Sequence, residues 1–418
     1  MAFPRRDLPR MARVRQDLPG DRVPDIARDV KTRLLASGLV QGIAPGHRIA
    51  ITAGSRGIGG LVELLKGIVQ AVNDRGATAF VVPAMGSHGG ATANGQAEIL
   101  RRLGVTDRTI GAPIHATMET VDLGASESGA VAHLDKLAFE SDGIIVLGRV
   151  KTHPESVGTL ASGLLKMCTI GLGKQAGAQQ AHGHGLWPSV VAVPKLQLAS
   201  GKILCGVAVV ENGYRQPCAI EVVPPTHEAF LAVDVRLLRL AKAHFARIPF
   251  DDLDLLVVDE LGKTISGGGM DPNIIGLWRN SDAPHHPDYR RIVVLSLTEA
   301  SLGNGLGIGM ADFTTRRFAD AYDPAVSYIN LLTATEPNGN TREGPLPLTL
   351  DSDREAIEVG LFSSHAGPSP RVCRIKNTAM LDEFWVSEAL VDEVEASSTL
   401  HLFAPPSAWP FDDRGNLL

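Results

Sequence analysis

The chain has 418 residues, of which 44% are hydrophobic and 21% charged, and its formal net charge is −6 at pH 7. This composition is typical of a globular protein with enough core for two domains, and the acidic balance argues against a nucleic-acid partner. No apolar run reaches the ~18 residues that a membrane span needs, so we expect no membrane association. The four cysteines form neither a C-x-x-C motif nor a disulfide-like spacing, which favours a reduced, cytoplasmic setting.

The chain begins with a basic segment, and no apolar stretch follows it, so we expect a short solvated arm rather than a targeting signal. Residues 48–54 (RIAITAG) predict a buried strand closed by glycine. Residues 60–77 predict a helix, because apolar residues recur at spacings of three or four, and residues 77–84 predict the next strand. This order predicts a parallel pair of strands with a right-handed crossover.

The same alternation continues along the chain. We expect strands at 143–148, 202–210, 253–260 and 291–297, and helices near 94–104, 158–168, 226–246 and 312–321. The pattern predicts an α/β fold with mainly parallel sheets. A long apolar helix ends at Pro249, so we divide the chain into domains at 1–250 and 251–418. Residues 345–353 are expected to be irregular, and residues 404–418 to form a surface tail.

The most informative stretch runs from Val146 to His184. It is rich in glycine, which lets the backbone pass close to a ligand, and it contains His153, Lys166 and His182. Lys166 lies among Leu, Met and Cys residues, where a lysine is costly to bury unless it is paired, neutral or covalently used. Histidines on either side of such a lysine indicate a metal or cofactor site.

Two further motifs follow predicted strands. Arg56 lies in AGSRGIGG after the strand RIAIT, and Gly86-Ser87-His88 follows the strand AFVVPAM. Loops at the carboxyl ends of parallel strands are where open α/β sheets bind ligands. The ordered set Arg56, His88, His153, Lys166, His182, with Lys166 in the motif SGLLKM, resembles the nickel-dependent lactate racemase family over roughly residues 25 to 300.

The resemblance implies two α/β domains with the active site in the cleft between them. It implies a nickel pincer nucleotide, which is a pyridinium-3-thioamide-5-thiocarboxylic acid mononucleotide that binds nickel through two sulfurs and a carbon. The cofactor would be attached covalently to Lys166, His182 would complete the nickel coordination, and Gly54 and Ser55 would help to hold it. Cofactor-synthesis enzymes are then implied as partners.

The resemblance further implies a racemase or epimerase of a small 2-hydroxy acid that works by reversible hydride transfer. His88 and His153 would be paired general acids and bases on opposite faces of the substrate. Arg56 would hold the substrate carboxylate or a cofactor anion. The family carries a substrate-binding Gln-x-x-Lys in its second domain, where this chain has Gly276 and Arg279. Arg279 could serve as a carboxylate clamp, and the missing Gln suggests an acid other than lactate.

Other interpretations stay open from the sequence. The turn from Gly54 to Gly59 is similar to the glycine turn of nicotinamide-dependent dehydrogenases, but no Tyr is followed four residues later by Lys, as that family requires. A relative that binds a ligand without catalysis is a third possibility. His182 and His184 could face one side of a strand and bind zinc, although no third ligand is evident. The glycine-rich loop Gly303–Gly309 has no specific ligand assigned.

Overall fold

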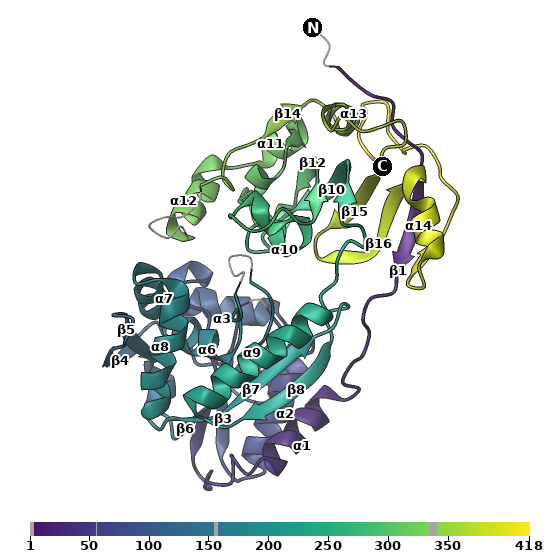
Figure 1. Ribbon diagram of the computed structural model, residues 1–418. Coiled ribbons are helices and arrows are strands. Elements are labelled where there is room, and N and C mark those ends of the chain that lie inside the picture. The colour runs from purple at the N-terminus through teal and green to yellow at the C-terminus, as the bar shows by residue number, and fades with distance from the viewer. Residues whose placement is uncertain (1–3, 56, 154–157, 335–340) are drawn as a thin grey trace. The chain divides into compact units, whose positions relative to one another are not determined.

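The computed structural model describes residues 4–55, 57–153, 158–334 and 341–418. The chain forms two compact units (Figure 1). The N-terminal unit is Pro19–Phe245, and the C-terminal unit combines the segment up to Leu18 with Ala246–Leu418. The predicted division at 250 is therefore wrong for the start of the chain, which belongs to the C-terminal unit. No helix of the described residues is both long and apolar enough to cross a membrane.

The N-terminal unit is built on a sheet with the strand order β3-β2-β6-β7-β8. Neighbours from β3 to β7 run parallel, and β8 is antiparallel to β7. Its strands are β2 (Arg48–Ala53), β3 (Thr78–Pro83), β6 (Gly143–Arg149), β7 (Ile203–Glu211) and β8 (Pro217–Val223), with a separate hairpin of β4 (Thr120–Ala125) and β5 (Val131–Asp135). Its helices are α1 (Ile26–Ala36), α2 (Leu61–Asn73), α3 (Ala93–Arg102), α4 (Asp107–Ile110), α5 (Lys136–Phe139), α6 (Leu164–Lys166), α7 (Lys174–Gly183), α8 (Leu186–Ala199) and α9 (His227–Ala243).

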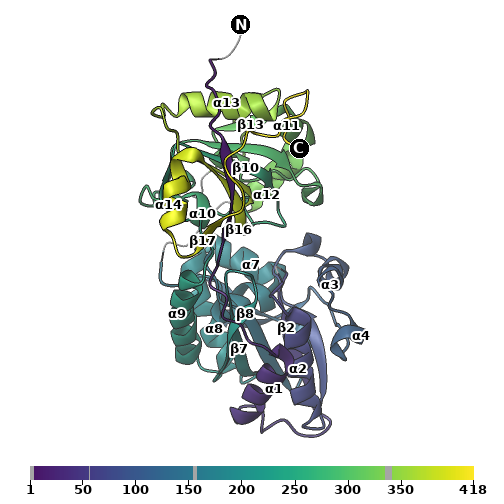
Figure 2. The ribbon, with the colours of Figure 1, turned by 90° about the vertical axis from the view of Figure 1, so that its right-hand side faces the viewer.

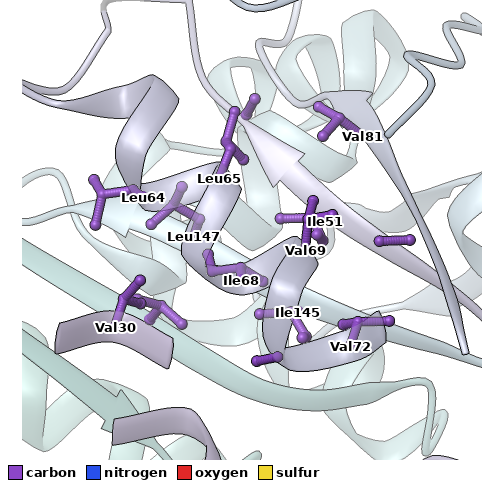
Figure 3. Packing of buried hydrophobic residues seen from close by; sticks show 14 of the residues in the cluster. Val30, Ile51, Leu64, Leu65, Ile68, Val69, Val72, Val81, Ile145 and Leu147 are labelled. Atoms are coloured by element: carbon purple, nitrogen blue, oxygen red, sulfur yellow. The ribbon is translucent and has the colours of Figure 1, made fainter. Parts of the chain in front are cut away.

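Both faces of this sheet are buried, which explains why its strands read as continuous apolar runs. Successive side chains of a strand point to opposite faces, so alternate residues of each strand enter different clusters. Figure 3 shows the first cluster, in which the apolar stripe of α2 packs on β2, β3 and β6. The second cluster joins the other face to α6, α7, α8 and α9. In Figure 2, α9 and the pair α1–α2 flank β7 and β8 from opposite sides.

The C-terminal unit contains a sheet with the order β14-β13-β12-β10-β15-β16-β1-β17, which is parallel from β14 to β15 and antiparallel beyond. The strands are β1 (Met11–Gln16), β10 (Leu255–Leu261), β12 (Ile292–Leu297), β13 (Phe313–Thr315), β14 (Leu348–Leu350), β15 (Val372–Asn377), β16 (Met380–Ser387) and β17 (Leu400–Leu402), with the short pair β9 (Asp252–Leu253) and β11 (Asp288–Tyr289). The helices are α10 (Pro272–Ile275), α11 (Arg316–Ala321), α12 (Pro324–Ala334), α13 (Asp353–Ser363) and α14 (Val391–Ala396). Both units are thus mixed α/β with mainly parallel sheets, as predicted.

Both ends of the chain pack against this unit, contrary to prediction. In place of a solvated arm, Met11–Gln16 form β1, which pairs with β16 on one side and β17 on the other. Arg5 contacts Glu355 of α13 at 2.5 Å. In place of a surface tail, the last residues bury Trp409, whose indole N–H donates to Pro9 O at 2.9 Å. Segments near the two ends of the described chain therefore contact each other.

Candidate active site

Three loops of the N-terminal unit leave the same edge of its sheet. β3, β2 and β6 are parallel neighbours, so their carboxyl ends lie together. The loop after β2 carries Gly54 and Ser55, the loop after β3 carries His88, and the segment after β6 carries His153. This is the edge at which open α/β sheets bind ligands. Arg56 lies outside the described residues.

Ser55 contacts His88 directly. The Ser55 hydroxyl oxygen lies 2.5 Å from His88 Nδ1, and this contact joins the loops after β2 and β3. His88 is exposed, whereas Ser55 is half-buried. The contact engages Nδ1 of the imidazole and so orients the ring between the two loops.

Trp187 brings His153 and Lys166 together. The His153 ring meets the indole edge-on, with ring centroids 5.4 Å apart. Lys166 Nζ lies 5.6 Å from the centroid of the same indole, which is a cation–π distance. An antiparallel bridge between Lys151 and Ser162 closes the base of the loop that carries His153, just before the helix that carries Lys166. His153 and Lys166 thus belong to one local arrangement.

Lys166 ends helix α6, which is shorter than predicted. The expected helix at 158–168 begins only at Leu164, because the preceding residues are held in the bridge to Lys151. After Lys166 the chain continues as a π-helix, Met167–Leu172. Such π-helical turns are rare and occur frequently at functional sites.

Asp234 of α9 fixes the start of α6. Its two carboxylate oxygens accept hydrogen bonds from the N–H groups of Leu164 and Leu165 at 2.8 and 2.9 Å. Burial raises the pKa of this carboxyl group to about 6, and the two hydrogen bonds oppose the rise. A Cβ added at Gly163 would lie 2.3 Å from the Asp234 carboxyl carbon, so only glycine allows this approach.

The π-helix also packs against the loops after β2 and β3. A Cβ added at Gly54 would lie 3.2 Å from the methyl carbon of Met167. A Cβ added at Gly86 would lie 2.9 Å from Ile170 Cγ2. Gly54 and Gly86 therefore leave room for the π-helix that follows Lys166 to pack against the loops that carry Ser55 and His88.

His182 lies on α7, which follows the π-helix. Ala178 and His182 are four residues apart and share a face of the helix. A Cβ added at Gly86 would lie 3.6 Å from Ala178 Cβ, so this face is turned toward the loop that carries His88. His184 is exposed, and its Nδ1 lies 3.0 Å from Gln180 O.

The zinc interpretation of His182 and His184 was wrong about their setting. Both lie at the end of a helix rather than on a strand, and helical residues two apart do not face the same way. Within residues 4–55, 57–153, 158–334 and 341–418, no group of three His, Cys, Asp or Glu side chains gathers as a metal site.

Other groups of the protein contact the glycine turn after β2 at Gly59. The Gly59 N–H donates to Glu211 Oε1 at 2.6 Å, and Glu211 also pairs with Arg149. A Cβ added at Gly59 would lie 1.9 Å from Arg215 O. This glycine is needed for close backbone packing, and a carboxylate accepts the N–H that a dinucleotide phosphate would need. The arrangement opposes the nicotinamide alternative.

Arg279 lies in the interior of the C-terminal unit. Its guanidinium donates to Met310 O at 2.8 Å and to Tyr289 O at 2.5 Å, and it pairs with Asp312 at 3.2 Å. Burial lowers the pKa of the guanidinium, and Asp312 opposes that effect. These contacts give Arg279 a structural role, and substrate binding by this residue stays a prediction.

The missing glutamine at position 276 has a physical reason. Gly276 has a φ of 108°, a conformation that side chains other than glycine rarely adopt, and an added Cβ would lie 2.5 Å from Trp278 Nε1. The loop Gly303–Gly309 has a similar account, because a Cβ at Gly307 would lie 1.7 Å from Gly268 O. These glycines allow two loops of the C-terminal unit to pack backbone against backbone.

Sequence reasoning did not identify Trp187, Asp234 or Lys174, a buried lysine at the start of α7. For Asp234 a signal existed, since an acidic residue lies among the apolar residues of the predicted long helix. Trp187 offered only the scarcity of aromatic residues in the chain, 5%. Its partners come from separate segments, and no local pattern joins them.

The comparisons with known proteins place the chain in a family without a described activity. Residues 61–348 match the family described as Domain of unknown function (DUF362). The chain belongs to this DUF362 family. No protein of curated function matches the chain.

Solved structures similar to this DUF362 chain include two at low identity. One is a crystal structure of a protein from Thermotoga maritima, with 12% identity and a TM-score of 0.47, covering 84% of this chain and 85% of that one. Another is the lactate racemase apoprotein from Thermoanaerobacterium thermosaccharolyticum, with 14% identity and a TM-score of 0.42, covering 83% of this chain and 82% of that one.

Proposed function

We propose that this protein is a racemase or epimerase of a 2-hydroxy acid that uses a nickel pincer nucleotide attached to Lys166. The observation that carries the proposal is the contact of His153 and Lys166 with one indole, at the sheet edge where Ser55 holds His88. Two imidazoles, from the loops after β3 and β6, and one amine, from the end of α6, are the groups that the sequence resemblance requires at one site.

The residues at this edge fit the cofactor in their chemistry. Lys166 is half-buried at a helix end, so its amine could carry a thioamide link to the cofactor. His182 would supply one imidazole to the nickel, a donor that suits Ni(II). One protein ligand suffices because the nucleotide brings its own donors. When bound, the cofactor would supply a reversible acceptor for the hydride on C2 of the substrate.

The chain's own residues would move the hydroxyl proton. His88 and His153 come from different loops, and each would face the substrate hydroxyl from its own side. Either imidazole can accept or donate a proton near neutral pH, so one would take the hydroxyl proton and the other would return one. Arg56 is the candidate for the substrate carboxylate, since a guanidinium binds a carboxylate through two parallel hydrogen bonds.

Attachment at Lys166 is the first test. We expect protein produced together with the cofactor-synthesis enzymes to show added mass on the peptide containing Lys166, with nickel in proportion. Lys166→Ala should lose both. Lys195→Ala is the matched control, because Lys195 is an exposed lysine of the same unit that pairs with Glu127, and it should keep both. Added mass on another lysine would contradict the assignment, as would racemisation by protein without added mass.

A further inference from the structure

A buried lysine lies beneath the loop of His88. Lys174, the first residue of α7, has no exposed surface, and neither has Asp135, whose Oδ2 lies 2.8 Å from Lys174 Nζ. Lys174 Nζ also donates to Pro83 O, at the last residue of β3. Burial lowers the pKa of Lys174, and Asp135 opposes that effect. The hydrogen bond to Pro83 O thus joins α7 to the point where the His88 loop begins, and the ion pair joins it to the end of β5.

Gln96 of α3 extends this network into the loop itself. Its side chain is fully buried, and its Oε1 accepts a hydrogen bond from Lys174 Nζ at 3.4 Å. Its Nε2 donates to Gly86 O at 2.8 Å and to His88 O at 3.2 Å. Because Lys174 can only donate, it fixes which end of the amide faces the loop. Gln96 therefore presents its donor to both loop carbonyls.

The backbone around this network is constrained at both ends. Lys174 has a φ of 55°, a left-handed conformation that a residue with a side chain rarely adopts. Gly89 packs against α3, where an added Cβ would lie 2.6 Å from Gln96 N. A residue keeps such a conformation only where its surroundings impose it. The groups that contact Lys174 include Gln96, which in turn donates to the loop that carries His88.

We propose that Lys174, acting through Gln96, is a positioning residue that holds His88 in place for proton transfer. Its effect on catalysis rests on the proposed function, whereas its effect on the His88 ring does not. Asp135 balances the buried positive charge of Lys174. The charged Lys174 can only donate, so it keeps the amide of Gln96 in one orientation. Lys174 is therefore distinct in role from Lys166, eight residues earlier in the chain.

The test uses the full chain and two perturbations. Gln96→Leu removes both donors to the loop. Lys174→Met combined with Asp135→Asn removes the ion pair without leaving a lone buried charge, and the amide introduced by Asp135→Asn keeps an acceptor for the N–H of Ala138. The control is Ser141→Ala, which removes a buried hydroxyl that contacts Ala138 O of α5 and Gly143 O, at the end of β6 opposite to the His153 loop.

The first readout is the nitrogen resonance pattern of the His88 ring in ¹⁵N-histidine-labelled protein without cofactor. We expect one defined tautomer in the wild type and in Ser141→Ala, and an averaged pattern in both network variants. The second readout is racemisation by the loaded protein. We expect kcat to fall by about tenfold to a hundredfold at nearly constant KM, because a displacement of about 1 Å can cost about 10²-fold.

The outcomes separate the two proposals. An unchanged His88 ring pattern in folded Gln96→Leu, with kcat within twofold of wild type, would overturn the positioning role. If the ring pattern changes as expected but no variant, including wild type, racemises a 2-hydroxy acid, the positioning role stands and the proposed function fails. If the paired variant does not fold, Gln96→Leu alone decides the outcome.

Discussion

His88 and His153 are each held by a neighbour that does not titrate near neutral pH. The hydroxyl of Ser55 contacts one ring, and the indole of Trp187 meets the edge of the other. These two contacts orient the imidazoles, and each contact joins its histidine to a different segment of the chain. Residue-scale predictions therefore concern the two imidazoles themselves.

Each imidazole should be essential for racemisation in both directions. We expect His88→Ala and His153→Ala each to lower the rate by about 10²–10⁴-fold, since a complete cycle uses both groups. A 2-deuterated substrate should keep its label on C2 of the product, because hydride held on a cofactor does not exchange with water. His184→Ala is the control, since His184 is exposed and contacts Gln180 O, and it should remain near wild type. Rapid loss of deuterium to solvent would instead indicate proton abstraction from carbon.

The sequence predicted those candidate residues whose signal is local. His88 and His153 follow predicted strands, and Lys166 is surrounded by apolar residues, so each could be found within a short window. Trp187 and Lys174 could not, because their roles arise from contacts between segments far apart in the chain. The packing of Arg279 in the interior was missed for the same reason.

At the scale of elements, α6 depends on a carboxylate supplied by α9. The pKa of Asp234, about 6, lies above its usual value of 3.8, so the folded state binds this proton more tightly than the unfolded state. Its contribution to stability is therefore full below about pH 4 and is lost as the pH rises through about 6. The difference corresponds to about 3 kcal/mol.

We expect Asp234→Asn to remove this component of the pH dependence. In the wild type, the titration of Asp234 should lower the free energy of unfolding of the N-terminal unit by up to about 3 kcal/mol between pH 4 and pH 7. This part of the decrease should be absent in Asp234→Asn. Urea unfolding at several pH values measures it. Asp74→Asn, at an exposed carboxylate of the same unit, should follow the wild-type profile. Parallel profiles for Asp234→Asn and wild type would show that the carboxyl group titrates normally.

The elements that the sequence predicted best are those with both faces buried. The parallel strands β2, β3, β6 and β7 agree closely with the predicted ranges, because continuous apolar runs admit few alternatives. The helix expected at 158–168 failed where a bridge and a π-helix replace regular hydrogen bonding. The strand β1 was missed although MARVRQ alternates buried and exposed residues, because its arginines suggested a solvated arm.

At the scale of the whole molecule, the chain starts in the C-terminal unit, continues through the whole N-terminal unit and then returns to the C-terminal unit. Composition and length predicted two units but could not show this return, because the pairing of β1 with β16 joins residues more than 360 positions apart. The two units differ in what they contain. The N-terminal unit contains His88, His153 and Lys166, whereas the sheet of the C-terminal unit includes the first strand of the chain.

Removal of residues up to Leu18 should therefore affect the two units unequally. Met11, Ala12 and Val14 of β1 are buried, and the strand lies between β16 and β17, so its loss exposes apolar surface and two strand edges. Burial of one large aliphatic side chain contributes about 1.5–3 kcal/mol, and we expect the C-terminal unit to lose about 5 kcal/mol. Hydrogen exchange followed by mass spectrometry should show faster exchange in peptides of β16, β17 and α13, with peptides of β2, β3 and β6 unchanged. Arg13→Ala, at an exposed position of β1, should leave both sets unchanged. Equal acceleration in both sets would mean that the units unfold as one and that the return of the chain couples them.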